Sequence, residues 1–236
     1  MAEYIIQDST LTAIGDAIRA KTGGAELIVP ENMPTEIESI QSGGEDWVNQ
    51  ITTYANLFYL REFPEGYNLV IKFNDFAQPD LSQMCAYTRN LNSVKIKGTV
   101  INNAAVNRTF RSSHVKTIDL TECIIKSPSN KAQETFFGCY YLHTIIGTID
   151  FSQCLGFVNT YSSCSELVNV EFLPNNIFYS ILFAQSPLLS DESIQSIING
   201  LATVDTAQTL MLHTDVKAKL TEAQIAQITS KNWNLA

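Results

Sequence analysis

The chain has 236 residues, of which 45% are hydrophobic and 17% are charged, a balance typical of a folded protein rather than a disordered one. Its net charge of −9 and isoelectric point near 4.8 disfavour a nucleic-acid partner, because such binding relies on lysine and arginine to neutralise phosphates. No run approaches the ~20 apolar residues that span a bilayer, and residues 1–8 lack the basic start and apolar stretch of a signal peptide, so we expect neither membrane insertion nor secretion.

Residues 1–42 predict a small helical module that attaches to something else. Ser9 can cap a helix over residues 11–21, in which apolar residues recur at three and four positions, and Gly23 and Gly24 end it. Pro34 starts a second short helix over residues 34–40. A segment this short buries too little apolar surface to be stable alone, so we expect it to bind another copy of itself or a larger assembly. The candidate attachment or oligomerisation residues are the apolar ones, Leu11, Ile14, Ile18, Ile37 and Ile40.

Residues 43–189 predict a body built from β-strands. Ser42, Gly43 and Gly44 look like a linker, and the chain that follows is rich in β-branched and aromatic residues separated by Asn, Ser and Gly turns. We expect one or two strands in each successive stretch, the clearest of them over residues 69–73, 94–101, 117–120 and 144–151.

A repeat runs through this body. One apolar residue, here called the anchor, recurs at intervals of 31, 24, 27, 25 and 21 residues, at Leu60, Leu91, Val115, Leu142, Leu167 and Leu188. Two copies, residues 136–145 and 161–170, share the pattern aromatic-x-x-Cys-x-x-Leu-x-x-aliphatic. A unit of this length cannot close a core alone, so neighbouring copies should stack and form apolar ladders. The sequence therefore predicts an irregular α+β solenoid with one parallel sheet, and a departure from the regular coil stays open for residues 54–110.

Residues 190–236 predict a helical cap over the last copy of the repeat. Ser190 can cap a helix over residues 190–201 that opens with the acidic pair Asp191 and Glu192. A strand over residues 209–212 precedes a second helix, which Thr221 opens. A stacked repeat needs its last copy covered, and this segment is placed to cover it.

Three parts of the chain resemble known proteins. The aromatic-x-x-Cys-x-x-Leu copies, within residues 54–189, resemble the BspA-like leucine-rich repeats of bacterial surface proteins. Residues 9–23, followed by residues 33–40, resemble the amino-terminal module of structural proteins of tailed phages and prophages of Gram-positive bacteria, and residues 189–235 are similar to the ending of the same proteins. The resemblance implies a virion component of the tail or tail-fibre type.

What the resemblance implies about function is an exposed fibre or baseplate appendage that contacts the host surface. Its partners would be other virion proteins, bound through residues 1–42, and a bacterial surface glycan or protein. It would be made in the host cytoplasm, reside in the virion and form a homo-oligomer, with a trimer as one form. Two alternatives stay open: a head fibre or capsid decoration protein, and a cellular BspA-like adhesin, which should show a signal peptide or a wall anchor.

The sequence offers no metal, cofactor or catalytic motif. Its three histidines, His114, His143 and His213, lie far apart and lack the spacing of a zinc site, and no nucleophile elbow, P-loop or HExxH motif occurs. Stacking could bring together the carboxylates of Asp75 and Asp80 or of Asp119 and Asp150, as in the wall-degrading glycosidases of phages, although such residues also cap their own turns. We expect no enzyme, and a cell-wall hydrolase is the least favoured alternative.

The five cysteines, by contrast, predict reduced core residues. Their number is odd and no two have CxxC spacing, so they do not suggest a disulfide framework. Cys139 and Cys164 occupy the same position in two copies of the repeat, and a disulfide between them stays open.

Three tyrosines are candidate surface-contact residues. Most aromatic residues of the body should lie in the core, but exposed ones could form a face that binds a glycan or a protein, because an aromatic ring gives a large contact area at little entropic cost. The candidates are Tyr140, Tyr141 and Tyr161.

Overall fold

The computed structural model describes residues 46–48, 62–73, 81–98, 101–102, 106–123, 125–126 and 132–236. The chain divides into two units, Met1–Glu45 and Asp46–Ala236, and everything below concerns the second. The predicted helical module, residues 1–42, lies outside the described residues, and so do the anchor Leu60 and the predicted attachment residues Leu11, Ile14, Ile18, Ile37 and Ile40. These remain predictions.

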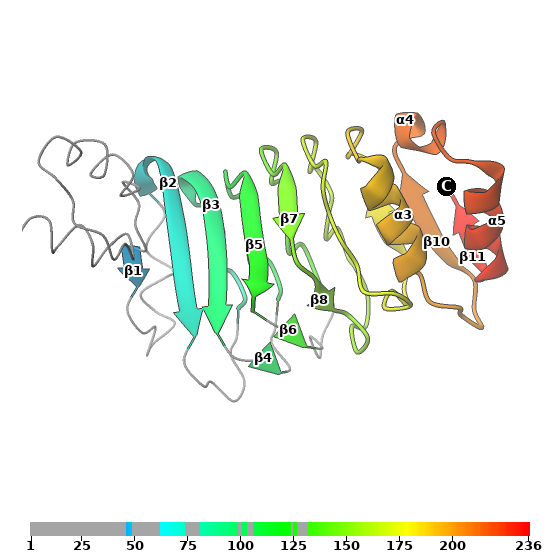
Figure 1. Cartoon of the computed structure of the whole chain (residues 1–236), viewed down its shortest axis with the longest axis horizontal. Helices are drawn as coiled ribbons and strands as arrows, with labels where there is room; N and C mark the ends of the chain where they lie inside the picture. Colours follow the sequence, from blue (N-terminus) through cyan, green and yellow to red (C-terminus); the bar gives the residue numbers. More distant parts are fainter. Residues whose placement is uncertain are drawn as a thin grey trace, which may run out of the picture. The chain divides into compact units, whose positions relative to one another are not determined.

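The main element of the second unit is a five-stranded sheet in which every strand pair is parallel (Figure 1). Its strands follow one another in chain order: β1 (Asp46–Val48), β2 (Glu62–Phe73), β3 (Arg89–Gly98), β5 (Thr117–Glu122) and β7 (Thr144–Ile146). Between two parallel neighbouring strands, the chain must cross back to the end of the sheet at which the first strand began. The chain makes that return between each strand and the next, as predicted for stacked copies of a repeat.

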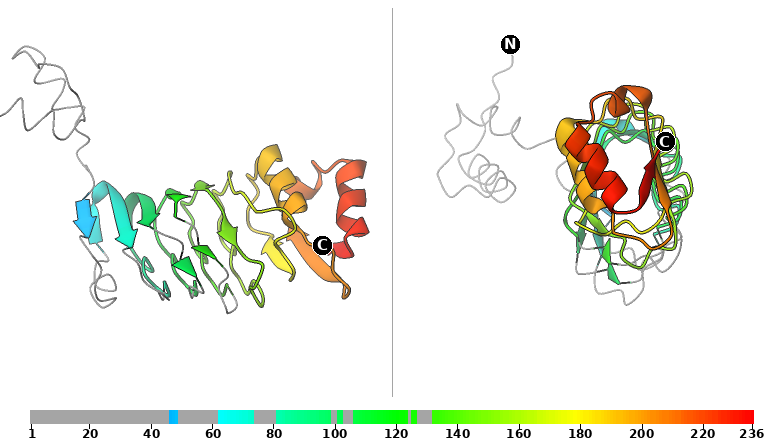
Figure 2. Two further views of the ribbon diagram at one scale, coloured as in Figure 1. Left: turned by 60° about the horizontal axis from the view of Figure 1, so that its bottom comes forward. Right: turned by 90° about the vertical axis from the view of Figure 1, so that its right-hand side faces the viewer.

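Two smaller parallel sheets continue this arrangement. The first pairs β4 (Ile101–Asn102), β6 (Ile125–Lys126) and β8 (Ile149–Asp150), and the second pairs β9 (Ile181–Phe183), β10 (Gln208–Leu212) and β11 (Trp233–Leu235). Viewed end on, successive turns of the chain overlie one another (Figure 2). The predicted α+β class and the parallel pairing of the strands are confirmed, but the described strands form three sheets rather than the one that was predicted.

The inner face of the main sheet is a ladder of apolar side chains. Leu69, Val94, Ile118 and Ile145 are partners in successive strand pairs, and each is at most 5% exposed. Side chains alternate between the faces of a strand, so a buried residue at every second position, as in β5, marks a strand with one face in the core. One face of β2, β3, β5 and β7 thus packs inward, and the other is left for solvent.

A second ladder is aromatic. Phe110, Phe136, Tyr161 and Phe183 are all buried, and their ring centroids lie 5.7, 5.2 and 4.7 Å apart in successive stacked pairs. Phe136 and Tyr161 hold the aromatic position of the two best copies of the repeat, and Phe110 and Phe183 continue their stack on either side. Each of the two middle rings, Phe136 and Tyr161, packs between two neighbouring rings.

A third ladder is polar and contains the repeated cysteine. The Cys139 thiol donates to the backbone carbonyl of Phe110 at 2.8 Å, and the Cys164 thiol donates to that of Phe136 at 3.1 Å. Ser113 lies at the corresponding position of the preceding copy, where its hydroxyl lies 2.6 Å from that of Thr88. All five cysteines are buried and reduced, which confirms the prediction, and Cys139 and Cys164 form no disulfide. Burial raises the pKa of the Cys139 thiol to about 12, which keeps it in the unreactive form.

Four of the predicted anchors are buried, and one is wrong. The correct ones are Leu91, Val115, Leu142 and Leu167. Leu188, however, is 51% exposed, and the buried residue of that copy is Leu189. The backbone shows why, because Val168 N–H donates to His143 and Ser190 N–H donates to Val168, which aligns Ser190 with the residue after each anchor. The sequence alone could not show which of the two adjacent leucines, Leu188 or Leu189, is the buried one.

The two predicted helices and the predicted strand of the C-terminal segment are confirmed. Helix α3 (Asp191–Gly200) is capped by Ser190, α4 (Thr214–Lys217) follows β10, and α5 (Glu222–Ser230) opens with a capping box between Thr221 and Gln224. Ile194 and Trp233 are buried in the core that begins at Leu69, so the segment continues that core. No helix of the described residues combines the length and apolarity that a bilayer crossing requires.

Helices α3 and α5 are joined by polar contacts. Gln224 Nε2 donates to Gln195 Oε1 at 3.0 Å, and Gln227 Nε2 donates to Asn199 Oδ1 at 3.1 Å. The Lys231 ammonium, just after α5, donates to the backbone carbonyls of Ile198 and Asn199 at 3.1 and 3.2 Å, and also to that of Leu201. A cation at this end of α3 satisfies carbonyls that have no partner within the helix and faces the negative end of its dipole.

Candidate functional site

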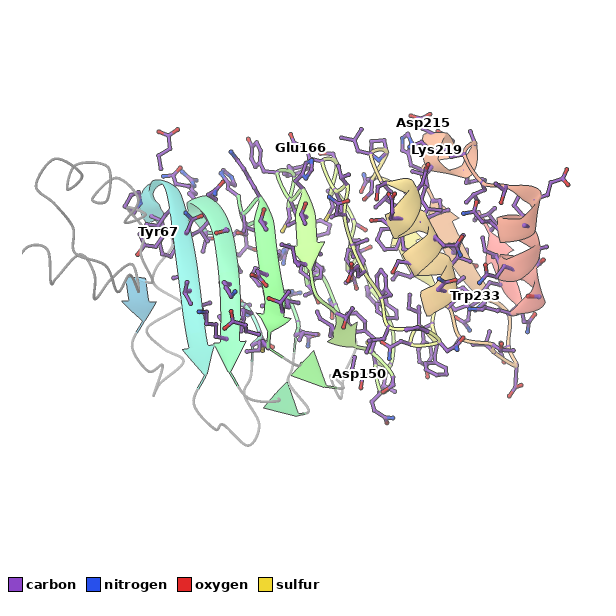
Figure 3. The ribbon with its side chains drawn as sticks, in the orientation of Figure 1. Tyr67, Asp150, Glu166, Asp215, Lys219 and Trp233 are labelled. Carbon is purple, nitrogen blue, oxygen red and sulfur yellow. The ribbon has the colours of Figure 1, made fainter. Side chains whose placement is uncertain are left out.

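Two rows of exposed or half-exposed side chains flank the buried anchors, at the end where the strands of the main sheet begin and on the two turns of the chain that follow β7. The residue before each buried anchor forms the first row, and all five members are exposed: Asn90, His114, Tyr141, Glu166 and Leu188. The residue after each anchor forms the second: Asn92, Lys116, His143, Val168 and Ser190. We call these ten residues the loop edge. Figure 3 labels Glu166 on this edge, and Asp150 on the opposite one.

Backbone hydrogen bonds hold the loop edge in line. Lys116 N–H donates to the carbonyl of Asn92 at 3.0 Å, His143 to Lys116 at 2.8 Å, Val168 to His143 at 2.9 Å and Ser190 to Val168 at 3.0 Å. Side chains on adjacent turns of the chain therefore lie one strand spacing apart, about 4.8 Å. The core positions these residues even though most of them lie outside the strands.

The loop edge differs from the core in composition. At the buried positions the same residue types return in successive copies, namely leucine, an aromatic residue, and cysteine or serine. In the row before the anchors, no residue type occurs twice. Uniform buried positions below varied exposed ones are what a repeat scaffold needs when its surface recognises a ligand.

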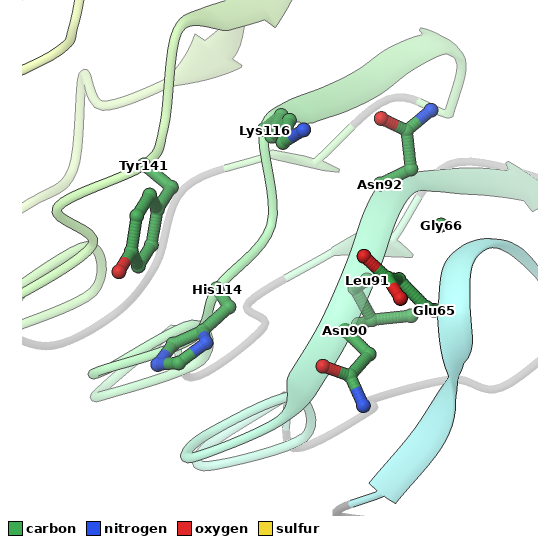
Figure 4. A pocket seen from close by; sticks show the side chains of 8 residues that line it. All are labelled: Glu65, Gly66, Asn90, Leu91, Asn92, His114, Lys116 and Tyr141. Carbon is green, nitrogen blue, oxygen red and sulfur yellow. The ribbon is translucent and has the colours of Figure 1, made fainter.

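A pocket of about 290 Å³ opens where the loop edge begins (Figure 4). Its lining comes from β2, from β3 and from the turns that precede β5 and β7: Glu65, Gly66, Asn90, Leu91, Asn92, His114, Lys116 and Tyr141. Neighbouring turns of the chain thus contribute side chains to one cavity.

The two asparagines of this pocket have fixed orientations. Asn90 Nδ2 donates to the backbone carbonyl of Phe63 at 3.0 Å, and Asn92 Nδ2 donates to Asn68 Oδ1 at 2.9 Å. Both amide nitrogens are therefore held toward β2. In Figure 4 the two Oδ1 atoms point away from β2, toward the side of the pocket that carries His114 and Lys116. They present two hydrogen-bond acceptors to whatever occupies the cavity.

The side of the pocket away from β2 carries two aromatic rings. The rings of His114 and Tyr141 lie 5.0 Å apart with an interplanar angle of 58°, and Tyr141 is 44% exposed. An exposed ring held by a neighbour can accept a flat or apolar group at little entropic cost. The pocket therefore combines an aromatic surface with amide, carboxylate and ammonium groups.

Two of the three predicted surface-contact tyrosines are exposed, and the third is buried. Tyr140 and Tyr141 are exposed, at 55% and 44%. The prediction for Tyr161 is wrong, because its side chain is 2% exposed and stacks between Phe136 and Phe183. Tyr161 occupies the aromatic position of its copy, whereas Tyr140 and Tyr141 follow the cysteine of theirs.

Sequence reasoning missed most of the pocket. It considered His114 only as a possible zinc ligand, and it did not single out Glu65, Asn90, Asn92 or Lys116. The available signal was position, because four lining residues flank the anchors Leu91 and Val115 directly. A rule that selected the residues on both sides of every anchor would have found the pocket.

The predicted carboxylate pairs are only partly described. Asp75 and Asp80 lie outside the described residues. Asp119 accepts the backbone N–H of Thr121 at 2.9 Å, and Asp150 accepts that of Ser152 at 2.9 Å, so each caps its own turn, as the alternative interpretation held. Across the described ranges, no cluster of three or more histidine, cysteine or acidic residues is placed to hold a metal ion.

Asp119 also belongs to an ion-pair cluster on the outer face of the main sheet. Lys95 Nζ lies 3.2 Å from Asp119 Oδ2 and 2.5 Å from Glu122 Oε1. Burial alone would raise the pKa of Asp119, but the hydrogen bonds from Thr121 and Lys95 outweigh that effect, so the pKa is lowered. The Asp119 carboxylate therefore stays charged at neutral pH, which suits a structural ion pair rather than a proton donor.

This cluster predicts a small dependence of stability on pH. A carboxyl group whose pKa is lowered in the folded state adds stability above its unfolded pKa, near 4, and that stability is lost as the pH falls through the folded value. Asp119→Asn is expected to remove about 0.5 kcal/mol at pH 7 and to flatten the acid limb of the stability profile. Urea unfolding from pH 7 to pH 2 measures both. Asp205→Asn, at an exposed position, is the control, and equal profiles for the two variants would contradict the assignment.

The loop edge is the part of the described residues whose geometry suggests a binding function. It contains one pocket that joins three turns of the loop edge, lined by groups suited to binding a polar ligand. Comparisons with protein-family models, with curated proteins and with solved structures found no match to the chain.

Proposed function

We propose that the chain is a structural protein of a phage virion, an exposed appendage of the tail or baseplate that binds the host surface through the loop edge. The body would be an irregular leucine-rich-repeat solenoid of the BspA-like kind, with residues 190–236 as its cap. Three features support the solenoid: the parallel strands in chain order, the aromatic ladder and the repeated thiol-to-carbonyl hydrogen bonds.

The pocket between Asn90 and Tyr141 is the observation that carries the binding role. Its lining comes from successive turns of the chain, and apart from Leu91, which is buried in the core, the lining residues are exposed or half-buried. A bacterial surface glycan is the better match of the two partners expected from the sequence. Sugar hydroxyls both donate and accept, so they can pair with the amide oxygens as well as with Lys116, and the C–H face of a sugar can pack on Tyr141.

A single pocket of this size binds weakly, so affinity would come from several copies. If residues 1–42 join chains into a homo-oligomer on the virion, each further contact forms at a high effective concentration, and the total affinity can exceed that of one site by about 10² to 10⁴. A trimer satisfies this requirement. The proposal therefore separates a weak site in the described body from the attachment expected of residues 1–42.

Tyr141→Ala is expected to weaken binding to host cells at least tenfold, because stacked aromatic anchors contribute about 2 kcal/mol at binding sites. Flow cytometry of fluorescently labelled chain on intact bacteria measures this. Tyr179→Ala is the matched control, because Tyr179 is also exposed, at 40%, but does not line the pocket. Equal losses in the two variants, or no loss in either, would count against the loop edge as the binding surface.

Immunogold labelling of purified phage particles tests the virion role. Antibodies against the chain should label the tail tip or the baseplate. Label on the head would replace the tail role with the alternative of a head fibre or decoration protein. Particles without any label would remove the virion role altogether.

A further inference from the structure

Two opposite charges that form no ion pair with any described residue line the pocket of the loop edge. Glu65 on β2 and Lys116 before β5 are both exposed and both face this cavity. Among the described residues neither takes part in an ion pair, although other charged side chains do, such as Lys95 with Asp119 and Arg108 with Glu134. Figure 4 shows the Glu65 carboxylate and the Lys116 ammonium apart from each other, with the two asparagines in the same view.

The polar groups of the pocket divide into acceptors and donors. The acceptors are the Glu65 carboxylate and the Oδ1 atoms of Asn90 and Asn92, whose amide nitrogens are held away from the cavity. An ammonium group carries three N–H donors and no acceptor, so it suits a set of oxygens. The donors are the Lys116 ammonium and a ring nitrogen of His114, which suit a carboxylate or a phosphate.

We propose that this pocket takes a zwitterionic sugar unit, one that carries an ammonium group and an anionic group together. The inference rests on the proposed glycan-binding function and specifies the ligand class for the same site. The ammonium group meets Glu65 and the asparagine oxygens, the phosphate or carboxylate meets Lys116, and the sugar ring packs on Tyr141. A neutral sugar would leave both charges without a partner, and a sugar of one sign would satisfy only one of them.

Four small probes separate these contributions: glucosamine 6-phosphate, glucosamine, glucose 6-phosphate and glucose. Titration of each into the full chain at low salt, followed by ¹H–¹⁵N NMR, gives four dissociation constants. Glucosamine 6-phosphate should bind most tightly. Because ion pairs at exposed sites are weak, the amine and the phosphate should each improve affinity about two- to fivefold.

Two variants assign each charge to its partner. Glu65→Gln should abolish the preference for glucosamine over glucose and keep the preference for the phosphate, whereas Lys116→Met should do the reverse. Glu166→Gln, on the loop edge but outside the pocket lining, and Lys217→Met on α4 are the charge-matched controls and should change neither preference. Glu65, Lys116 and Glu166 are exposed and Lys217 is half-buried, and circular dichroism spectra like that of the unchanged chain confirm that a variant is folded.

The outcomes distinguish this inference from the proposed function. Equal affinities for the four probes, or a preference set by one charge alone, would overturn the zwitterionic ligand, and continued binding to host cells would leave the proposed function standing. If the chain binds cells but none of the probes, the zwitterionic ligand is likewise overturned and the proposed function stands. If the unchanged chain binds neither host cells nor any probe, the inference and the proposed function are both overturned.

Discussion

Phe136→Ala is expected to destabilise the described unit by about 3–5 kcal/mol, the range for removing a large aromatic side chain from a packed core. Phe136 has no exposed surface, and its ring stacks on Phe110 at 5.7 Å and on Tyr161 at 5.2 Å. The cavity left by the substitution would lie between two rings that are held by their own turns of the chain. Because neither ring can collapse into it, the loss should fall in the upper part of the range.

Equilibrium unfolding in urea, followed by circular dichroism and tryptophan fluorescence together, measures this loss. Tyr140→Ala is the control from the same copy of the repeat, and it should change stability by less than about 0.5 kcal/mol because Tyr140 is 55% exposed. A loss below about 1.5 kcal/mol for Phe136→Ala would show that the aromatic ladder does not hold the turns together. The same result would remove one support of the proposed solenoid.

Gly147→Ala is expected to cost about 3 kcal/mol, from a left-handed backbone and from overpacking together. Gly147, just after β7, has φ of +84°, and a Cβ atom there would lie 3.0 Å from the carbonyl carbon of Leu120 and 3.1 Å from the backbone nitrogen of Thr121. Backbone atoms of the neighbouring turn cannot move aside without disturbing β5. The substitution should therefore separate two turns of the chain that now touch.

Gly138→Ala is the matched comparison, because Gly138 also has a positive φ, of +71°, but its Cβ would meet only the Ser112 side chain and backbone, with the closest atom, Oγ, at 3.1 Å. Ser112 and Ser163, at the corresponding positions of the neighbouring copies, adopt positive φ with side chains present. Gly138→Ala should therefore cost about 1 kcal/mol. Urea unfolding of both variants tests the difference, and equal losses would refute the assigned close approach at Gly147.

The sequence predicted the repeated core well because burial leaves a periodic signal. Within the two best copies the aromatic, cysteine and leucine residues keep the same spacing, and the structure places Phe136, Cys139 and Leu142 in the core together with their counterparts in the next copy. The parallel order of the strands followed from stacking. The errors arose where two similar residues competed for one position: Leu188 was chosen over Leu189, and Tyr161 was treated as a surface residue although it fills the aromatic position.

The pocket could not be predicted in the same way, because its residues follow no periodic rule. Glu65 lies at a register irregularity of β2, which shifts its pairing with β3, and no pattern in the sequence marks that irregularity. The orientation of the Asn90 amide depends on the backbone of Phe63, which lies in the preceding strand. Groups from separate turns become a site only when the strand register is fixed, and a single sequence does not supply that register.

Ligand binding at the pocket should be separable from the stability of the fold. The lining residues Lys116 and Tyr141 follow or precede anchors but are themselves exposed, so substitutions there should alter ligand binding and leave the core intact. A separate hollow of about 370 Å³, on a different part of the surface, is lined by apolar residues including Leu155, Val158 and Tyr179. Its lack of charged lining residues makes it a useful reference surface for binding measurements.

Hydrogen–deuterium exchange of the chain, with and without cell-wall glycan from the host, tests the central claim most directly. If the loop edge binds the glycan, protection should appear in residues 87–92, 113–116 and 140–143, and residues 155–159 and 178–182 should exchange unchanged. Protection confined to residues 155–159 and 178–182, or no protection anywhere while the glycan is bound, would contradict the account.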